Sequence, residues 1–118
     1  MMKIFLAFSL VAITLGLSPQ FNPDMLQFPV QSSSATPGSP VGTSYASADN
    51  GQPVTYSLVH GDSEYFSIDA SSGEITFSNI DPSGKVMMVF SVKAVDSNGM
   101  ESYQPVAVWF EDLLVNTC

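Results

Sequence analysis

The residue types that could perform chemistry are few in this chain of 118 residues: one histidine, one cysteine and eleven acidic residues. His60 stands beside Asp62 and Ser63, but the members of a catalytic triad normally converge from separate segments. A single histidine and a single cysteine exclude most Cys/His metal sites and an internal disulfide framework. Since no nucleophile elbow, phosphate-binding glycine loop or zinc-ligand spacing is present either, we expect no enzymatic activity.

The balance of charge excludes two further classes of function. Eleven acidic residues stand against three lysines and arginines, which gives a net charge of -8 at pH 7. No basic face can form to neutralise phosphates, so the chain is not expected to bind nucleic acid or an anionic membrane surface. An apolar fraction of 45% is too high for a disordered chain. We therefore expect a folded domain.

The N-terminus has the features of a secretory signal. Ile4 to Leu17 is an apolar run with few interruptions, long enough for a signal core and too short to span a bilayer. Thr14 and Gly16 are small enough for a cleavage site, so residues 1–16 are predicted to be removed and the mature chain secreted. The alternative is a buried first strand or helix. No other run is long enough for a transmembrane segment.

Cys118, the last residue of the sequence, has no partner within the chain. In an oxidising compartment an odd cysteine suggests an intermolecular bridge. We therefore consider a disulfide-linked dimer through Cys118, or a link to a larger partner. The alternative is an incidental end residue of a truncated chain.

The elements that must position these residues are predicted to be strands. Residues 17–30 contain three prolines and read as an extended arm or first edge strand. Residues 31–44 are rich in Ser, Thr, Pro and Gly, which indicates a loop, either plain or O-glycosylated. Residues 113–118 are predicted to form a C-terminal tail.

Six short runs of strand-forming residues follow, and turn residues separate them about every ten residues. With the arm they predict an all-β, seven-stranded Greek-key β-sandwich of the Ig type over residues 31–112. The runs are Tyr45–Ala48, Val54–Val59, Tyr65–Ile68, Glu74–Phe77, Val86–Val95 and Tyr103–Phe110.

The period of two in the strands separates core from surface. The expected core residues are Val86, Met88, Phe90, Val92, Ala94, Val106, Val108, Phe110, Tyr56, Leu58, Phe66, Ile68, Ile75 and Phe77. Trp109, Met87 and Val89 then point outward, and an exposed Trp among aliphatic residues often marks an interface. The alternative is that the N-terminal arm, with Phe21, Met25 and Leu26, folds over them.

Several motifs, taken in order, resemble a cadherin repeat over residues 28–112. The runner-up is the related bacterial or dystroglycan-type cadherin-like module. The resemblance implies an Ig-like sandwich that binds Ca²⁺ through acidic loops. Its motifs are Pro40-Val41-Gly42-Thr43, Val54-Thr55-Tyr56-Ser57-Leu58, Phe66-Ser67-Ile68-Asp69-Ala70-Ser71-Ser72-Gly73-Glu74-Ile75, Val92-Lys93-Ala94-Val95-Asp96, and a looser Val106, Val108, Asp112.

Carried over residue by residue, the resemblance implies only part of a calcium site. Pro37, Gly51 and Ser83 stand where the family has acidic residues. Since Ca²⁺ takes six to eight oxygen ligands, we expect binding no tighter than millimolar. The alternative is that the remaining acids only form turns, a role also expected of Asp62 and Asp69. The candidate ligands are Asp49 and Asp96 at one pole, and Asp81, Glu111 and Asp112 at the other.

Two functions remain open. The first is a secreted, single-domain adhesion or binding module that contacts an extracellular protein or a second copy, with weak dependence on Ca²⁺. The second is an acidic structural component of an extracellular, mineralised matrix, because carboxylates attract Ca²⁺ loosely without a cage.

Overall fold

A computed structural model of the protein describes residues 18–114. The predicted signal peptide, residues 1–16, and Cys118 both lie outside this part of the chain. Between residues 18 and 114 no helix is long and apolar enough to cross a membrane.

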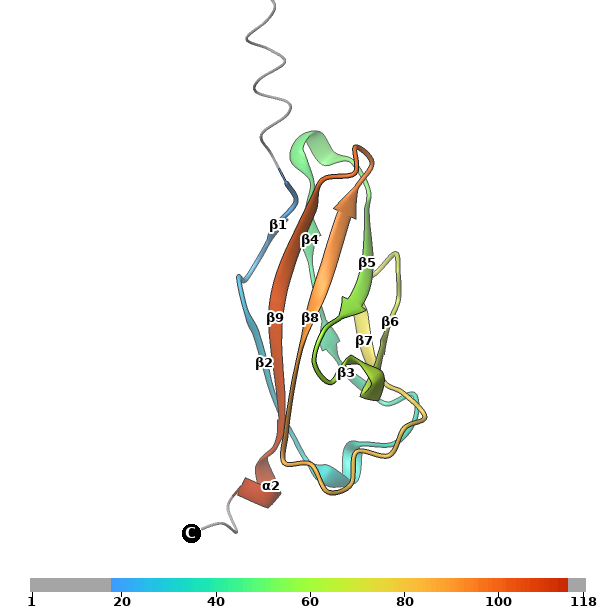
Figure 1. The fold of residues 1–118 in the computed structure, drawn as a ribbon, viewed down its shortest axis with the longest axis vertical. Coiled ribbons are helices and arrows are strands. Elements are labelled where there is room, and N and C mark those ends of the chain that lie inside the picture. The colour runs from blue at the N-terminus through green and yellow to red at the C-terminus, as the bar shows by residue number, and fades with distance from the viewer. Residues whose placement is uncertain (1–17, 115–118) are drawn as a thin grey trace, which may run out of the picture.

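Strands dominate the described chain (Figure 1), as the sequence predicts. Within residues 18–114, helical structure is confined to the short segments η2 (Ser32–Ser34), η3 (Asp49–Gly51), η4 (Ser63–Tyr65) and α2 (Glu111–Leu114). The strands are β1 (Gln20–Phe21), β2 (Leu26–Val30), β3 (Pro40–Thr43), β4 (Ala46–Ser47), β5 (Val54–Val59), β6 (Phe66–Ile68), β7 (Glu74–Phe77), β8 (Met87–Asp96) and β9 (Glu101–Phe110).

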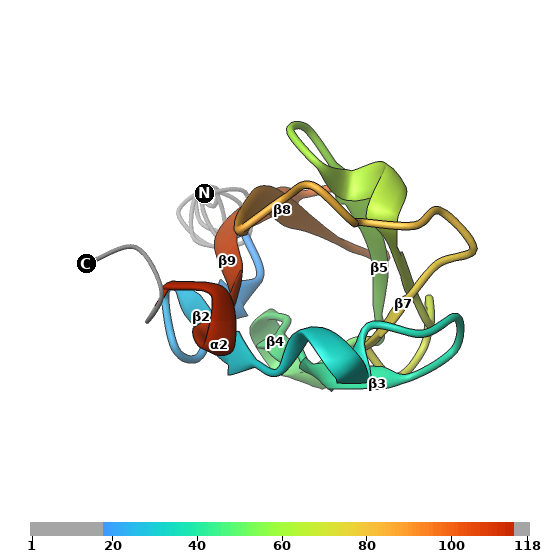
Figure 2. The ribbon, with the colours of Figure 1, turned by 90° about the horizontal axis from the view of Figure 1, so that it is seen from below.

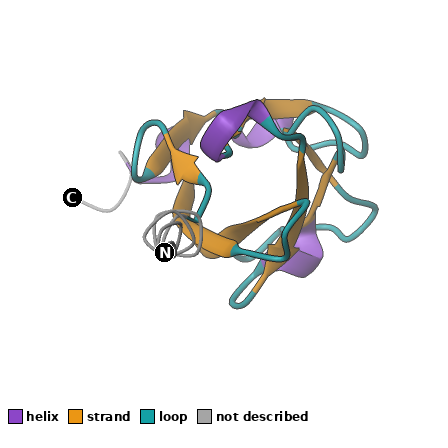
Figure 3. Ribbon diagram, turned by 90° about the horizontal axis from the view of Figure 1, so that it is seen from above, coloured by secondary structure: helices purple, strands orange, loops and turns teal. Residues whose placement is uncertain are grey.

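Two sheets face each other and enclose the core, as the end-on views show (Figures 2 and 3). One sheet has the strand order β2-β9-β8-β5, and the other has the order β3-β7-β6. The short strands β1 and β4 pair with each other beside them. The predicted all-β sandwich is therefore confirmed.

The core forms where the predicted alternation places apolar side chains between the sheets. β8 and β9 bury every second residue, including Met88, Phe90, Val106 and Val108. Aromatic rings fill the centre, since the Phe66 ring centroid lies 4.6 Å from that of Phe90 and 5.2 Å from that of Phe77. Such tilted pairs add to the stabilisation from burial.

The sequence prediction differs from the structure in three places. Residues 31–44 are not loop throughout, because Pro40–Thr43 form β3 against β7. Gly42 permits this, since a Cβ atom there would come within 2.5 Å of the Phe28 ring. Val86 was predicted to be core but is 37% exposed, because it lies just before the first residue of β8.

The third difference is the number of strands. Residues 18–114 contain nine strand segments where seven strands were predicted. The N-terminal arm supplies two of them: β1 pairs antiparallel with β4, and β2 pairs parallel with β9. The arm thus passes from the two-stranded β1-β4 sheet to the edge of the four-stranded sheet.

Buried polar groups hold the arm where it changes sheets. Gln104 on β9 is fully buried, and its Nε2 atom donates to Pro23 O at 2.6 Å. Its Oε1 atom accepts a 2.7 Å hydrogen bond from the buried Ser44 hydroxyl. Ser102 Oγ also donates to Pro19 O. Because buried polar groups are costly unless paired, these bonds fix the path of the arm.

Candidate functional site

Met87, Val89 and Trp109, the predicted interface residues, lie together on the outer face of the four-stranded sheet. Met87 is the direct cross-strand partner of Trp109, and Val89 is the partner of Ala107. On the other side of β9, Pro29 of β2 pairs with Trp109. We call the five residues Pro29, Met87, Val89, Ala107 and Trp109 the apolar face.

This surface stays open to solvent. Met87 is 50% exposed and Val89 49% exposed, while Trp109 is half-buried. Trp109 is flanked in the plane of the sheet by Pro29 and Met87, which accounts for its partial burial. The role of these residues in an interface stays a prediction.

The N-terminal arm does not cover the apolar face. It joins the sheet edge as β2, where Leu26 is buried and Phe28 packs against the core. Phe21 also packs against the core, whereas Met25 is 50% exposed. The arm therefore widens the sheet and leaves Met87 and Val89 uncovered.

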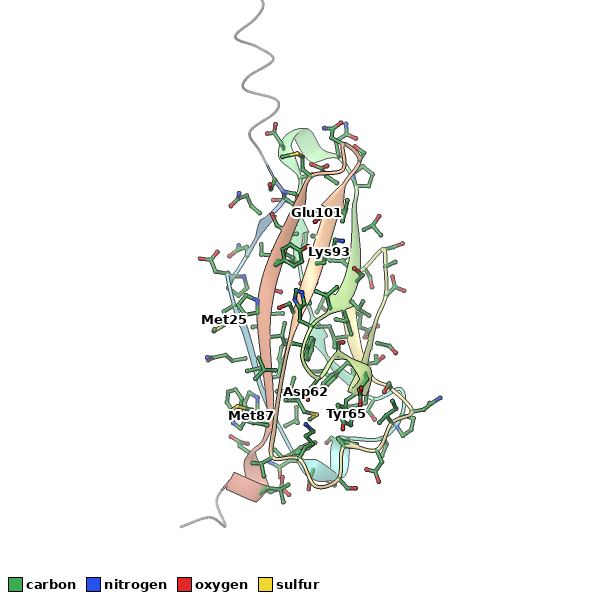
Figure 4. All side chains as sticks on the ribbon, in the orientation of Figure 1. Met25, Asp62, Tyr65, Met87, Lys93 and Glu101 are labelled. Atoms are coloured by element: carbon green, nitrogen blue, oxygen red, sulfur yellow. The ribbon has the colours of Figure 1, made fainter. Side chains whose placement is uncertain are left out.

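A charged pair lies farther along the same outer face. Lys93 of β8 and Glu101 of β9 are close together in Figure 4, with Nζ 3.5 Å from Oε2. The Tyr103 hydroxyl donates to Glu101 Oε1 at 3.0 Å, and this hydrogen bond raises the pKa of Tyr103 above its usual value. The outer face thus has an apolar end and a polar end, and the two charges at the polar end are of opposite sign.

His60 joins the polar end and forms no catalytic arrangement with Asp62. The His60 ring stacks on that of Tyr103, with the centroids 5.9 Å apart. The Asp62 carboxylate instead binds Lys85 Nζ at 3.0 Å and accepts from Val89 N–H at 3.0 Å. The bond from Val89, followed by that from Lys85, lowers the pKa of Asp62. Asp62 therefore stabilises the start of β8, where β5 has already ended.

At one end of the sandwich lie two of the candidate calcium ligands, Asp49 and Asp96. Asp49 begins η3, and Asp96 ends β8 at the turn into β9 (Figure 1). The Asp96 side chain is buried, and its Oδ1 atom accepts from Asn98 N–H and Met100 N–H, each at 2.9 Å. Asp96 therefore closes its own turn, as Asp69 does by accepting from Ser71 N–H and Ser72 N–H.

The other candidates, Asp81, Glu111 and Asp112, lie at the opposite end, and each has a protein partner. Asp81 accepts from both the N–H and the hydroxyl of Ser83. Glu111 accepts from Gln31 Nε2 at 3.4 Å. Asp112 accepts from Ser32 Oγ at 2.6 Å and Ser32 N–H at 2.9 Å, bonds that lower the pKa of Asp112.

These acids do not assemble into a cage for a cation. Residues 18–114 contain no group of three or more His, Cys, Asp or Glu side chains that could hold a metal ion. A Ca²⁺ ion takes six to eight oxygen ligands, so the carboxylates present do not fit a complete calcium site. The structure leaves calcium binding by these five residues as a prediction.

Sequence reasoning missed the pairing of the arm with β9 and the buried Gln104. The parallel pairing of β2 with β9 has no signal in the local sequence, because it joins residues that are about 80 positions apart. The one available signal for Gln104 was its inward position in the period-two pattern of β9, where it is a polar residue in a run of buried apolar ones.

Comparison with solved structures identifies the fold. The third cadherin domain of human protocadherin 7 matches with a TM-score of 0.66 and 22% identity, over 86% of this chain and 92% of that one. Human protocadherin-24 EC1-2 matches with a TM-score of 0.68 and 16% identity, over 80% and 43%. Drosophila N-cadherin EC1-3 matches with a TM-score of 0.69 and 15% identity, over 79% and 33%.

These matches confirm the predicted resemblance to a cadherin repeat at the level of the fold. The chain spans nearly the whole of the single-domain structure but less than half of the EC1-2 and EC1-3 structures. No protein-family model and no curated protein matches the sequence.

Proposed function

We propose that the protein is a secreted, extracellular contact module of cadherin-like fold, which acts through protein contacts and not through chemistry on a substrate. The observation that carries the proposal is the apolar face, an exposed row across β2, β9 and β8 on which Met87 and Val89 are half exposed. Contact residues of this type, with a Trp at the centre, are enriched where proteins bind each other.

The partner that this face fits best is a second copy of the chain. A molecule of net charge -8 is repelled by another acidic chain over most of its surface. The five side chains of the apolar face carry no charge. The pair Lys93 and Glu101 lies farther along the sheet, and the pair Lys85 and Asp62 lies beside Val89; in each pair the two charges balance. An exposed apolar surface beside a balanced charge pair is where two acidic copies can approach.

The positions of the apolar and charged side chains along the strands determine which orientation of the two copies is favourable. A two-fold axis parallel to the strands and between β8 and β9 places apolar end on apolar end. It also places Lys93 of each copy over Tyr103 of the other, with Glu101 two residues farther along β9. A two-fold axis across the strands would place Met87 and Trp109 against the charged pair. We therefore propose the axis parallel to the strands, because burial of apolar surface against apolar surface stabilises the dimer.

The size of the face indicates weak association. The four strands of this sheet are five to ten residues long. At a strand spacing of about 4.8 Å, their outer face covers on the order of 500 Å². Stable complexes bury roughly 800 Å² on each partner. We therefore expect a dissociation constant in the range of about 1 μM to 1 mM.

Substitution of Trp109 by alanine tests the contact surface. Trp109→Ala removes the largest side chain of the apolar face and is expected to raise the dissociation constant at least about tenfold. Sedimentation equilibrium measures the constant, and far-ultraviolet circular dichroism checks that the strands remain.

The matched control is Tyr45→Ala, which removes an exposed aromatic side chain next to β4, away from this sheet. Tyr45→Ala should associate like the parent chain. Equal weakening by both substitutions would contradict the proposed surface, and loss of the strand signal in Trp109→Ala would assign Trp109 to the core.

We further propose that calcium contributes little to the contact. Asp49, Asp96, Asp81, Glu111 and Asp112 remain the candidate ligands. Four of them already accept hydrogen bonds from neighbouring groups. A carboxylate that closes a turn can bind a cation only with its remaining lone pairs, which supports weak binding.

A further inference from the structure

Two consecutive methionines on β8 lie in opposite environments. Met87 is 50% exposed on the outer face, whereas Met88 is fully buried between the sheets. The pleat of the strand produces this contrast, because successive side chains point to opposite faces. Figure 4 labels Met87 and the equally exposed Met25 on the side of the molecule where β2 lies. A reagent in the solvent can therefore reach the Met87 side chain but not the Met88 side chain.

Met87 also lies directly beside Trp109, the central residue of the apolar face. Phe110 N–H donates to Val86 O, and Asp96 N–H donates to Met100 O, so the even-numbered residues of β8 bond to β9. Met87 and Trp109 are therefore a non-hydrogen-bonded pair, in which the side chains of antiparallel strands come closest. A polar group added to the Met87 side chain would therefore lie next to the Trp109 side chain.

We propose that Met87 is a site of oxidation by peroxide, and that its oxidation weakens the contact made through the apolar face. The effect on association depends on the proposed function, while the selectivity for Met87 over Met88 depends only on the fold. A peroxide is the oxidant, a class of molecule small enough to reach a half-exposed side chain.

The reaction is a two-electron oxygen transfer. A lone pair on Met87 Sδ attacks one peroxide oxygen, the S–O bond forms and the O–O bond breaks. With hydrogen peroxide the other oxygen leaves as water after proton transfer, so methionine is oxidised to the sulfoxide and peroxide is reduced. The sulfoxide is polar and chiral, and such a change disrupts methionine-containing interfaces.

Oxidation and association then oppose each other. Packing of a second copy on the apolar face covers Met87 and shields its sulfur from peroxide. Conversely, a sulfoxide beside Trp109 must be desolvated for the second copy to bind.

Peptide mapping by mass spectrometry tests the selectivity. The full chain is treated with hydrogen peroxide at a concentration where it is monomeric, and fragmentation assigns the added oxygen. We expect Met87 to oxidise at least about tenfold faster than Met88. Equal rates, or faster oxidation of Met88, would overturn the proposal, and neither outcome depends on self-association.

Sedimentation equilibrium before and after peroxide treatment tests the effect on association. The dissociation constant of the parent chain is expected to rise about tenfold. That of Met87→Leu, whatever its starting value, should not change. Met100→Leu, altered at the β8–β9 turn, should respond like the parent chain. A response in Met87→Leu as large as in the parent would overturn the role of Met87. A parent chain that is monomeric before treatment would instead contradict the proposed function, while the oxidation rates would still decide the modification site.

Discussion

At the scale of single residues, the acidic side chains are mostly occupied within the fold. Asp96, Asp81 and Asp69 each accept from backbone N–H groups two to four residues ahead, which closes the turn that follows. Asp112 instead reaches Ser32, eighty residues away in sequence, and ties α2 to η2. Asx turns and caps of this kind satisfy backbone groups that strands leave unpaired at their ends.

Calcium should therefore raise the thermal stability only slightly. With a millimolar dissociation constant, about 5 mM Ca²⁺ contributes about 1 kcal/mol, which is an increase in Tm of about 5 °C or less for a domain of this size. Differential scanning fluorimetry in Ca²⁺ and in the same concentration of Mg²⁺ measures the difference.

The matched variant is Asp96→Asn, which keeps an Oδ1 acceptor for Asn98 and Met100 but removes the charge. It should fold normally and lose any Ca²⁺-specific shift at that end. An increase in Tm above about 10 °C would show a complete site and contradict weak binding. Retention on calcium mineral without any shift would favour the matrix role.

At the scale of the elements, the crossing of the N-terminal arm from β4 to β9 depends on one buried side chain. Gln104 bonds at once to the Ser44 hydroxyl and to the carbonyl of Pro23, between β1 and β2. Gln104→Leu keeps the approximate volume but leaves both of these groups without their Gln104 partner. We expect a loss of about 1–3 kcal/mol in the free energy of unfolding.

Urea denaturation measures that loss, and amide hydrogen exchange at Asn22, which donates to Tyr45 O, reports whether the arm is released. Ser44→Ala combined with Gln104→Leu is the control, because it removes both ends of one hydrogen bond. The double variant should lose less than the sum of the single variants. A Gln104→Leu chain as stable as the parent would show that packing alone holds the arm.

The strands that were predictable are those with strong local signals. Val54–Val59 and Glu74–Phe77 have the predicted bounds, because alternating apolar residues end at glycine-containing turns on both sides. The same alternation predicted which residues of β8 and β9 point into the core, and it was wrong only for Val86, which lies just before β8. The parallel pairing of β2 with β9 could not be predicted, since register between distant segments is decided by packing, such as that of Phe28 against Gly42.

The candidate site was predictable only as a set of outward residues. The period of two placed Met87, Val89 and Trp109 on one side of their strands. It did not show whether the arm covers them, because that depends on Leu26 and Phe28 pointing into the core at the sheet edge. Likewise, the sequence placed Asp96 and Asp81 in turns, but only the structure shows which N–H groups they accept.

At the scale of the whole molecule, the distribution of charge and apolar surface is uneven. The chain carries a net charge of -8. Five of its acids, Asp49, Asp96, Asp81, Glu111 and Asp112, lie at the two ends of the sandwich. The outer sheet face between them has an apolar end and a polar end with one balanced pair, Lys93 and Glu101. This arrangement supports the proposed face-to-face packing of two such sheets with their strands parallel.

A charge exchange tests this association most directly. Lys93→Glu alone and Glu101→Lys alone each place like charges across the proposed two-fold axis, so each variant should be monomeric in sedimentation equilibrium under conditions where the parent chain dimerises. An equimolar mixture restores both opposite-charge pairs and should form a heterodimer about as stable as the parent dimer. A monomeric parent chain, or two single variants that dimerise as well as the parent, would contradict self-association through the outer face of the β2-β9-β8-β5 sheet.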